Sequence, residues 1–258
     1  MLHCMMIKLN EICRYPVKGL SADVISSAEL SVGGALPLDR KWGIIHAASA
    51  IDASDPKWGP KKNFLMLAKD EKIGSLTSKF DEDGNILTIF RKGKQISRGS
   101  LSDPMGKQVL QTFLSGFMPS GARGHPKIVK APTEDCFSDV PENFLSIINL
   151  ESVKDLETRI IRKAVDPHRF RGNLYISGTP AWSELDWVGK KLSIGNVEME
   201  VIEPIKRCQA TNILPGVGDV DMNIPLSLQK AYGHPNCGIY VKVTKAGKVN
   251  TGDEIRLS

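Results

Sequence analysis

The chain has 258 residues, 41% of them hydrophobic and 24% charged, with a formal net charge of +5 at pH 7. This is an ordinary composition for a soluble protein, and the length allows one large domain or two small ones. No apolar run approaches the roughly 18 residues that cross a bilayer, and the modest charge is weak evidence for nucleic-acid binding, so we expect neither a membrane nor a nucleic-acid partner.

The cysteines are odd in number and scattered along the chain: Cys4, Cys13, Cys136, Cys208 and Cys237. None forms a CxxC pair, which argues against a disulfide framework or a zinc site. The chain starts without the sustained apolar segment and small-residue cleavage site of a secretion signal. We therefore expect a reducing, cytoplasmic location.

The first part of the chain alternates like β-structure and is interrupted by turns. A strand from Ile7 runs into a turn, stiffened by a proline and relaxed by a glycine, that presents the Lys18 ammonium. A second strand is predicted at 24–31. Asp39 and Arg40 precede the next strand, and such a pair is usually a surface ion pair of little energetic value. Its guanidinium could instead face a phosphate or carboxylate, which its fork of donors suits.

The middle of the chain contains a loop, a hairpin and a helix. Residues 51–63 are polar and rich in Gly and Pro, which predicts an exposed loop. Gly84-Asn85 predicts a hairpin turn, and Asp103 followed by proline predicts a helix N-cap. The helix places on one face Val109, Leu110, Phe113, Leu114 and Phe117. The glycine-rich segment 119–126 ends this helix and is the preferred domain boundary.

The second half resumes with strands predicted at 127–130 and 145–148 and an amphipathic helix at 150–160. The segment 168–178 then carries Arg169 and Arg171 into another strand. If both arginines lie in the strand, alternation puts them on one face, where two guanidiniums repel unless an anion lies between them. The alternative is a pair of solvated arginines on an open sheet.

Cys208 follows a predicted strand at 197–202 and comes directly after Lys206 and Arg207. A thiol beside two cations at a strand end tends toward the thiolate, which is both nucleophilic and metal-binding. The alternative is a small buried apolar residue, since free cysteines are among the most buried residue types. The chain beyond it reads as loop, a short helix near 225–232 and two or three strands, so many short strands with few helices predict a β-barrel-rich α+β fold.

Common catalytic motifs are missing. The chain has no dinucleotide fingerprint, Walker loop, HExxH motif or G-x-S-x-G elbow. Cys208 with His168 or His234 is a formal candidate for a Cys–His nucleophile pair. Lys18 is one for a Schiff-base lysine, although the large α/β fold usual for pyridoxal phosphate enzymes is not indicated.

Several segments, in order, resemble the MOSC family, named for the C-terminal domain of molybdenum cofactor sulfurases. They are YPVKGL (15–20), LDRKWGI (38–44), RFRGNLYISG (169–178), the aromatic patch 182–189, IKRC (205–208) and NCGIYVKV followed by GDEI. The arrangement is similar to that of bacterial MOSC proteins and the mitochondrial amidoxime-reducing components. The resemblance implies an N-terminal MOSC β-barrel domain at 1–121 and a MOSC domain at 122–258.

The resemblance also implies a site for the molybdenum cofactor, a molybdopterin. In it Cys208 would be the protein ligand to molybdenum, and Asp139 would occupy the family's acidic position near the metal. The anionic end of the cofactor would be held by basic and amide side chains: Lys18, Arg40, Arg169, Arg171, Asn173 and Arg207. The chain departs from the family at Val140-Pro141, where the reductases often have Thr-Ser, and at Lys206, where the mitochondrial branch commonly has serine.

What the resemblance implies for function is an oxidoreductase that reduces N-hydroxylated or N-oxide compounds. Because the chain lacks the clustered cysteines of a ferredoxin domain, we expect electrons from a separate ferredoxin- or flavin-type protein. An alternative is a molybdenum cofactor carrier or sulfur relay, in which Cys208 holds a persulfide. A third is a barrel that has lost its ligand and serves as an interaction module.

Overall fold

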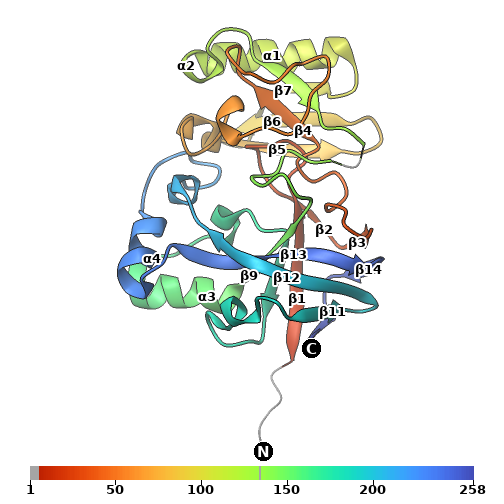
Figure 1. Ribbon diagram of the computed structural model, residues 1–258. Coiled ribbons are helices and arrows are strands. Elements are labelled where there is room, and N and C mark those ends of the chain that lie inside the picture. The colour runs from red at the N-terminus through yellow and green to blue at the C-terminus, as the bar shows by residue number, and fades with distance from the viewer. Residues whose placement is uncertain (1–5, 134) are drawn as a thin grey trace, which may run out of the picture.

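The computed structural model describes residues 6–133 and 135–258. The lower half in Figure 1 is a β-barrel that seven of the described strands close into a ring. In order around the ring these are β10 (Leu174–Ser177), β9 (Leu145–Asn149), β13 (Asn236–Lys245), β12 (Val197–Lys206), β11 (Lys191–Ile194), β15 (Glu254–Leu257) and β1 (Ile7–Arg14), which pairs back onto β10. The prediction of a mainly β chain with a barrel and few helices is confirmed.

Alternate residues of the barrel strands fill its interior, as a period of two requires. In β12, Val197, Met199 and Val201 are at most 1% exposed, whereas Glu200 between the last two is exposed. The strand predicted at 197–202 continues to Lys206 and delivers Arg207 and Cys208 at the end of the barrel. Strand β12 therefore ends just before Cys208, the candidate metal ligand.

The upper part of the molecule holds two further sheets and two helices (Figure 1). A three-stranded sheet contains β5 (Leu76–Asp81), β6 (Ile86–Arg91) and β7 (Lys94–Ser100), while β4 (Trp42–Ile45) pairs with β8 (Lys127–Lys130). The helices are α1 (Pro104–Phe117) and α2 (Pro119–Ala122), and short 3-10 turns occur at η1 (Lys61–Asn63) and η2 (Glu71–Ser75). Their shared core includes Trp42, Ile73, Leu87, Leu110 and Leu114.

Helix α1 begins as predicted, since the Asp103 carboxylate accepts a hydrogen bond of 2.7 Å from the Gly106 amide. The predicted apolar face is wrong at one position. Leu110 and Leu114, four residues apart, are fully buried, but Val109 is 47% exposed. Val109 lies one step, about 100°, around the helix from that stripe and so faces solvent.

Helices also cover one side of the barrel. Helix α3 (Leu150–Asp155) continues into a π-helical turn, η3 (Leu156–Ile161), and α4 (Ile224–Tyr232) packs beside them. Three further 3-10 turns are η4 (Pro167–Phe170), η5 (Ser183–Trp187) and η6 (Gln209–Asn212). In the part of the chain described, no helix combines the length and the apolar composition needed to cross a bilayer.

Two predicted strands differ from the structure. The strand expected at 24–31 is divided at Ser26 into β2 (Asp23–Ile25), which pairs with β1, and β3 (Ser27–Leu30), which pairs with β14 (Gly247–Asn250). The alternation expected for Arg169 and Arg171 is wrong, because Pro167 opens the turn η4 and the strand begins only at Leu174.

The domain boundary between residues 121 and 122 stays a prediction. Strand pairs join residues from either side of it: β1 with β10 and β15, β3 with β14, and β4 with β8. Strand β1 thus helps to build the barrel formed mainly by the second half of the chain.

Candidate functional site

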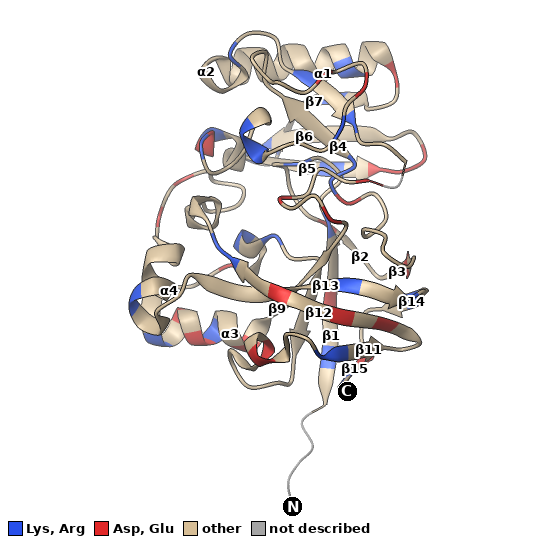
Figure 2. Cartoon of the chain, viewed as in Figure 1, with Lys and Arg blue, Asp and Glu red and all other residues tan. Residues whose placement is uncertain are grey.

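A cavity of about 350 Å³ lies where β9, β12 and β13 approach loops of the upper part. The eight residues singled out from the sequence all line it: Lys18, Arg40, Asp139, Arg169, Arg171, Asn173, Arg207 and Cys208. Among its described lining residues, seven are lysine or arginine and two are acidic, and we call it the cationic cavity. Figure 2 shows Lys and Arg on segments of both parts at their junction.

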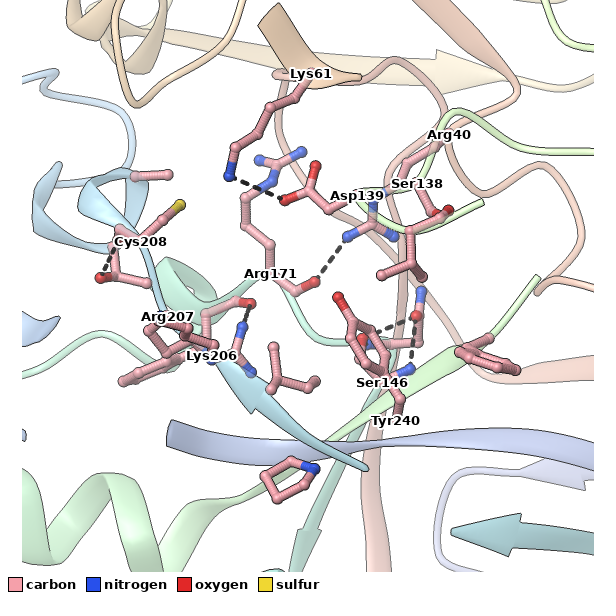
Figure 3. Close-up of a pocket in the computed structure, with 18 of the residues that line it drawn as sticks. Arg40, Lys61, Ser138, Asp139, Ser146, Arg171, Lys206, Arg207, Cys208 and Tyr240 are labelled. Atoms are coloured by element: carbon pink, nitrogen blue, oxygen red, sulfur yellow. Dashed lines mark hydrogen bonds and ion pairs between the residues drawn. The ribbon is translucent and has the colours of Figure 1, made fainter. Parts of the chain in front are cut away.

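Cys208 is the thiol of this cavity. It is half-buried and directly precedes η6, whose Thr211 hydroxyl and amide both donate to the Cys208 carbonyl, at 2.9 and 3.1 Å. The amide of the preceding Arg207 donates to the Pro235 carbonyl at 2.9 Å, which ties the strand end to the neighbouring chain segment. In Figure 3 the sulfur points toward the end of the Lys61 side chain. The alternative of a fully buried thiol does not describe Cys208, whereas Cys13, Cys136 and Cys237 are all buried.

Arg40 and Arg171 flank the ring of Tyr15, with guanidinium carbons 4.9 and 4.2 Å from its centroid. Arg40 also pairs with Asp39 and donates to the Arg171 carbonyl at 2.9 Å. Both arginines have left-handed backbones, with φ of 47° and 51°, a conformation that costs a non-glycine residue roughly 1–2 kcal/mol. Strained conformations of this kind cluster at functional sites, and here they direct two cations at one spot.

Arg169 and Arg207 are held more firmly. The Arg169 side chain is fully buried and pairs with Asp221 at 2.7 Å. Arg207 donates to the carbonyls of Cys237 and Phe170, at 2.7 and 2.8 Å. The two arginines of segment 168–178 thus both reach the cavity, although through a 3-10 turn rather than through strand alternation.

Three guanidinium nitrogens of these arginines lack a hydrogen-bond partner. Of six such buried side-chain atoms in residues 6–133 and 135–258, half belong to the cationic cavity: Arg169 Nε, Arg171 Nη2 and Arg207 Nη2. Buried donors are nearly always satisfied, so each exception needs an explanation. Burial also lowers the pKa of Arg171, the more so because Arg40 is nearby. All three arginines line the cavity, so an anion bound there is one explanation for unpartnered guanidinium donors.

Lys18 and Asp139 form an ion pair of 2.8 Å on the opposite wall. Two carbonyls, of Phe137 and Ser138, also accept from the Lys18 ammonium at 2.7 and 3.1 Å. Burial disfavours the charged forms of both Lys18 and Asp139. At Asp139 the charge and hydrogen bond of Lys18 have the larger effect and hold the pKa of the carboxyl well below its usual range. Asp139 is therefore an anion at neutral pH, and Lys18 has three partners already.

Lys61 was missed by the sequence analysis, which assigned 51–63 to an exposed loop. Its ammonium lies 4.0 Å from Asp139 Oδ2 (Figure 3). Burial lowers the pKa of Lys61, but Asp139 and the Cys208 thiol raise it by more. The available signal was the pair Lys61-Lys62 directly after Gly59-Pro60, a cation presented by a turn just as Lys18 is.

Asn173 joins three barrel strands. Its side-chain oxygen accepts from the Ser146 amide and hydroxyl, at 3.0 and 2.9 Å, and its amide group donates to the Cys13 carbonyl at 3.2 Å. Asn173 is 2% exposed, so its evident contacts hold β1, β9 and β10 together at the cavity floor. Its predicted cofactor contact, like the other residue roles, stays a prediction.

Comparison with known proteins identifies the family of the second half of the chain. Residues 134–256 match the model of the MOSC domain. Mitochondrial amidoxime reducing component 2 of Bos taurus is 35% identical over 42% of this chain and 35% of its own length. Molybdenum cofactor sulfurase of Arabidopsis thaliana is 36% identical over 87% of this chain and 31% of its own length. The chain thus spans about a third of the length of these relatives.

Among solved structures, the YUAD protein from Bacillus subtilis covers 98% of this chain and 96% of its own, with 12% identity and a TM-score of 0.46. The family match covers the segment that contributes Asp139, the arginine turn η4 and Cys208 to the cationic cavity. The chain is a MOSC domain protein, with the matched domain at residues 134–256.

Proposed function

We propose that this protein binds a molybdenum cofactor in the cationic cavity and reduces N-hydroxylated or N-oxide compounds with electrons from a separate ferredoxin- or flavin-type protein. The observation that carries the proposal is that three arginines, each with an unpartnered buried donor, line the same cavity as the half-buried thiol of Cys208. An anionic pterin with a soft metal matches both features.

The four arginines of the cationic cavity suit the anionic end of such a cofactor. Guanidinium groups suit phosphate because their planar fork donates two parallel hydrogen bonds. Arg169, Arg171 and Arg207 each retain an unpartnered donor, and Arg40 adds charge beside Arg171. These four residues, with Lys18 contributing charge, would hold the phosphate.

The Cys208 thiol suits the metal of such a cofactor. A thiolate is a soft ligand, which suits a heavy transition metal, so Cys208 would be the protein ligand. When bound, the cofactor supplies the two-electron redox chemistry, which no side chain of this chain provides. Reduction of an N–OH group to N–H and water also consumes two protons. Lys61 Nζ carries a proton beside Cys208, and the Asp139 carboxylate keeps it charged.

The relatives support the same function through the part of their length that this chain spans. An amidoxime reducing component is by name a reductase, and its match covers 42% of this chain. We extend that activity class to this chain because the cavity contains all eight residues expected from the family resemblance.

The test is to produce the full chain in a host that makes the cofactor, measure molybdenum per chain, and assay a hydroxylamine anaerobically with an artificial reductant. We expect about one molybdenum per chain and turnover, both lost in Cys208→Ala. Cys237→Ala is the matched control, since its thiol does not line the cavity. Absence of turnover from molybdenum-loaded protein would contradict the reductase proposal.

A carrier or sulfur-relay role is the alternative, and the sulfurase match supports it by covering the larger share of this chain, 87%. In that role Cys208 would hold a persulfide rather than a metal. Mass spectrometry after incubation with a cysteine desulfurase separates the two roles. A persulfide on Cys208 in protein that takes up no molybdenum would favour the relay.

We also infer a reducing location such as the cytoplasm. The four cysteines in the described ranges, Cys13, Cys136, Cys208 and Cys237, are all free, and reducing compartments keep thiols so. Thiol alkylation of rapidly quenched cells expressing the protein should label Cys208. Recovery of Cys208 in a disulfide would contradict this location.

A further inference from the structure

Glu11, Cys13 and His168 meet on the outer side of the barrel, and none of the three lines the cationic cavity. The β1–β10 ladder has a bulge between Leu9 and Glu11. Because of it Leu9 and Ile12 both face the barrel core, whereas Cys13 packs in the separate cluster beneath α3 and α4. Glu11 and Cys13 therefore share the outer face of β1, and η4 brings His168 to them from more than 150 residues away along the chain.

Three different ligand atoms converge here. Glu11 Oε1 lies 2.9 Å from Cys13 Sγ and 2.6 Å from His168 Nε2, and one donor atom from each residue lies within 4.8 Å of both others. Thiolate sulfur, imidazole nitrogen and carboxylate oxygen are the ligands that zinc and similar divalent metals take. We propose that Glu11, Cys13 and His168 bind a zinc-class divalent cation, with solvent at the fourth position.

The spacing is close to what such a cation requires. Tetrahedral bonds of about 2.0–2.1 Å to nitrogen and oxygen and about 2.3 Å to sulfur separate ligand atoms by roughly 3.3–3.6 Å. The two contacts of 2.9 and 2.6 Å must therefore each lengthen by about 0.7 Å. Cys13 is fully buried, but the side chains of Glu11 and His168 are 33% and 37% exposed. These two half-exposed side chains can make that adjustment while Cys13 stays in place.

The surroundings also prepare His168 for a metal. Asp166 Oδ1 lies 3.5 Å from His168 Nδ1 and accepts a hydrogen bond of 2.8 Å from the His168 amide. A carboxylate beside the second ring nitrogen is the usual partner of a metal-binding histidine, and it orients Nε2 toward the ion. Here Nε2 is the atom that faces Glu11 and Cys13.

Without a metal, the Cys13 thiol keeps its proton and donates it in a hydrogen bond to Glu11 Oε1. Burial, then the hydrogen bond and charge of Glu11, raise the pKa of the Cys13 thiol well above its ordinary value. A bound cation would replace that proton as the partner of the sulfur, the thiol proton would leave to solvent, and the ring proton of His168 would lie on Nδ1, beside Asp166.

The site is of a kind that the cysteine pattern did not indicate. The absence of a CxxC pair argued against zinc, but this set uses one cysteine and takes its other ligands from a neighbouring strand position and a distant turn. It is also distinct from the proposed cofactor site, because none of the three residues lines the cationic cavity, although Cys13 is hydrogen-bonded to the lining residue Asn173.

Cobalt(II) is the probe, since thiolate bound to tetrahedral cobalt gives a near-ultraviolet charge-transfer band and strong visible bands. The full chain should be used in a Cys4→Ala/Cys208→Ala background, which removes the accessible cavity thiol and the N-terminal one. We expect one cobalt per chain, the charge-transfer band, and displacement of both by zinc. The band should be lost in Cys13→Ser and retained in Cys136→Ser.

Substitutions at the half-exposed ligands keep the test decisive if Cys13→Ser does not fold. Glu11→Gln and His168→Gln each remove a ligand and should weaken cobalt binding at least ~100-fold. Asp166→Asn should weaken it about 10-fold, since losing a carboxylate that orients a metal-binding histidine typically costs about 10–100-fold. His234→Gln should bind as the background protein does. Absence of the band in the background protein, or its persistence in Cys13→Ser or His168→Gln, would overturn the proposal.

Discussion

The two walls of the cationic cavity are built differently. On the barrel side Arg169 is fully buried and paired, and Arg207 is fixed by two backbone carbonyls. On the opposite side Lys61 and Asp139 have side chains that are 41% and 51% exposed and lie 4.0 Å apart. The barrel wall is thus preorganised, with its cations oriented before any ligand arrives. On the opposite wall Lys18 is buried with three partners, and Lys61 and Asp139 are the side chains that can adjust to what enters.

This difference matches two separate tasks. Holding an anion benefits from fixed donors, since a rigid site loses little freedom when the ligand binds. Receiving varied small substrates and exchanging protons with solvent requires an accessible wall. We therefore expect substitutions in the barrel wall to reduce the stability of the fold, and substitutions in the opposite wall to spare it.

Gly238→Ala should have the largest effect on stability, because Gly238 packs closely against Arg207. Gly238 has φ of 77°, and a Cβ there would lie 2.4 Å from the Ile147 carbonyl oxygen and 3.1 Å from Arg207 Nη2. We expect a loss of about 3 kcal/mol in the free energy of unfolding, from backbone strain and overpacking together. Urea unfolding measures it.

Gly233→Ala is the matched control for this substitution. Gly233 has φ of 76°, nearly the same as Gly238, but nothing lies within 4 Å of a Cβ built on it. It should therefore lose only about 1 kcal/mol, from backbone strain. Equal losses for the two glycines would show that close packing around Arg207 contributes nothing.

Arg169→Met should come second. It removes a fully buried cation and leaves Asp221 without its 2.7 Å partner. Breaking a buried pair usually costs 3–5 kcal/mol, but Lys163 still pairs with Asp221 at 2.9 Å, so we expect about 2 kcal/mol. Lys163→Met, at a side chain that is 57% exposed, should cost under about 1 kcal/mol. If both variants unfold at the same urea concentration, the buried pair is not what stabilises this wall.

Asp139→Asn tests the opposite wall through pH. Lys18 holds the pKa of Asp139 below its usual range despite burial. The wild-type advantage over the variant should therefore be constant above about pH 5 and decline as pH falls below 3.8 toward the folded-state pKa. Since Asp139 is half-exposed, we expect at most about 1 kcal/mol at neutral pH. An advantage that instead grows in acid would show that Lys18 does not stabilise the charged carboxylate.

The sequence predicted most of the site but less of its geometry. Cys208 and the arginines were found because cations beside a strand end and a lone thiol are chemically unusual, and because the family resemblance joined them. Arg169 and Arg171 were given the wrong local structure, since a 3-10 turn with one left-handed residue has no periodic pattern. The Asp221 partner of Arg169, 52 residues away, follows from tertiary packing alone.

Lys61 and the Glu11–Cys13–His168 set show the same limit. A polar, proline-rich loop reads as exposed whether or not it folds back over a cavity, so Lys61 gave only the weak signal of a turn-presented cation. Glu11 and Cys13 lie close in sequence, but their shared outward direction depends on a bulge in β1. Strand alternation determines side-chain direction only where the register is regular.

Lys61→Met should have the smallest effect on stability and so gives the sharpest contrast with the barrel wall. Lys61 is the missed residue, and its one ion pair with another described residue is a 4.0 Å contact between half-exposed side chains. Such pairs contribute little, so the free energy of unfolding should change by less than about 0.5 kcal/mol. If Lys61 acts through its proton, molybdenum content should stay at the wild-type level while turnover of the loaded protein falls about 10–100-fold. Lys62→Met, the neighbouring lysine that does not line the cavity, is the control and should change neither. If Lys61→Met instead lost molybdenum and turnover in parallel, Lys61 would belong to the groups that hold the cofactor. The assignment of different tasks to the two walls would then be wrong.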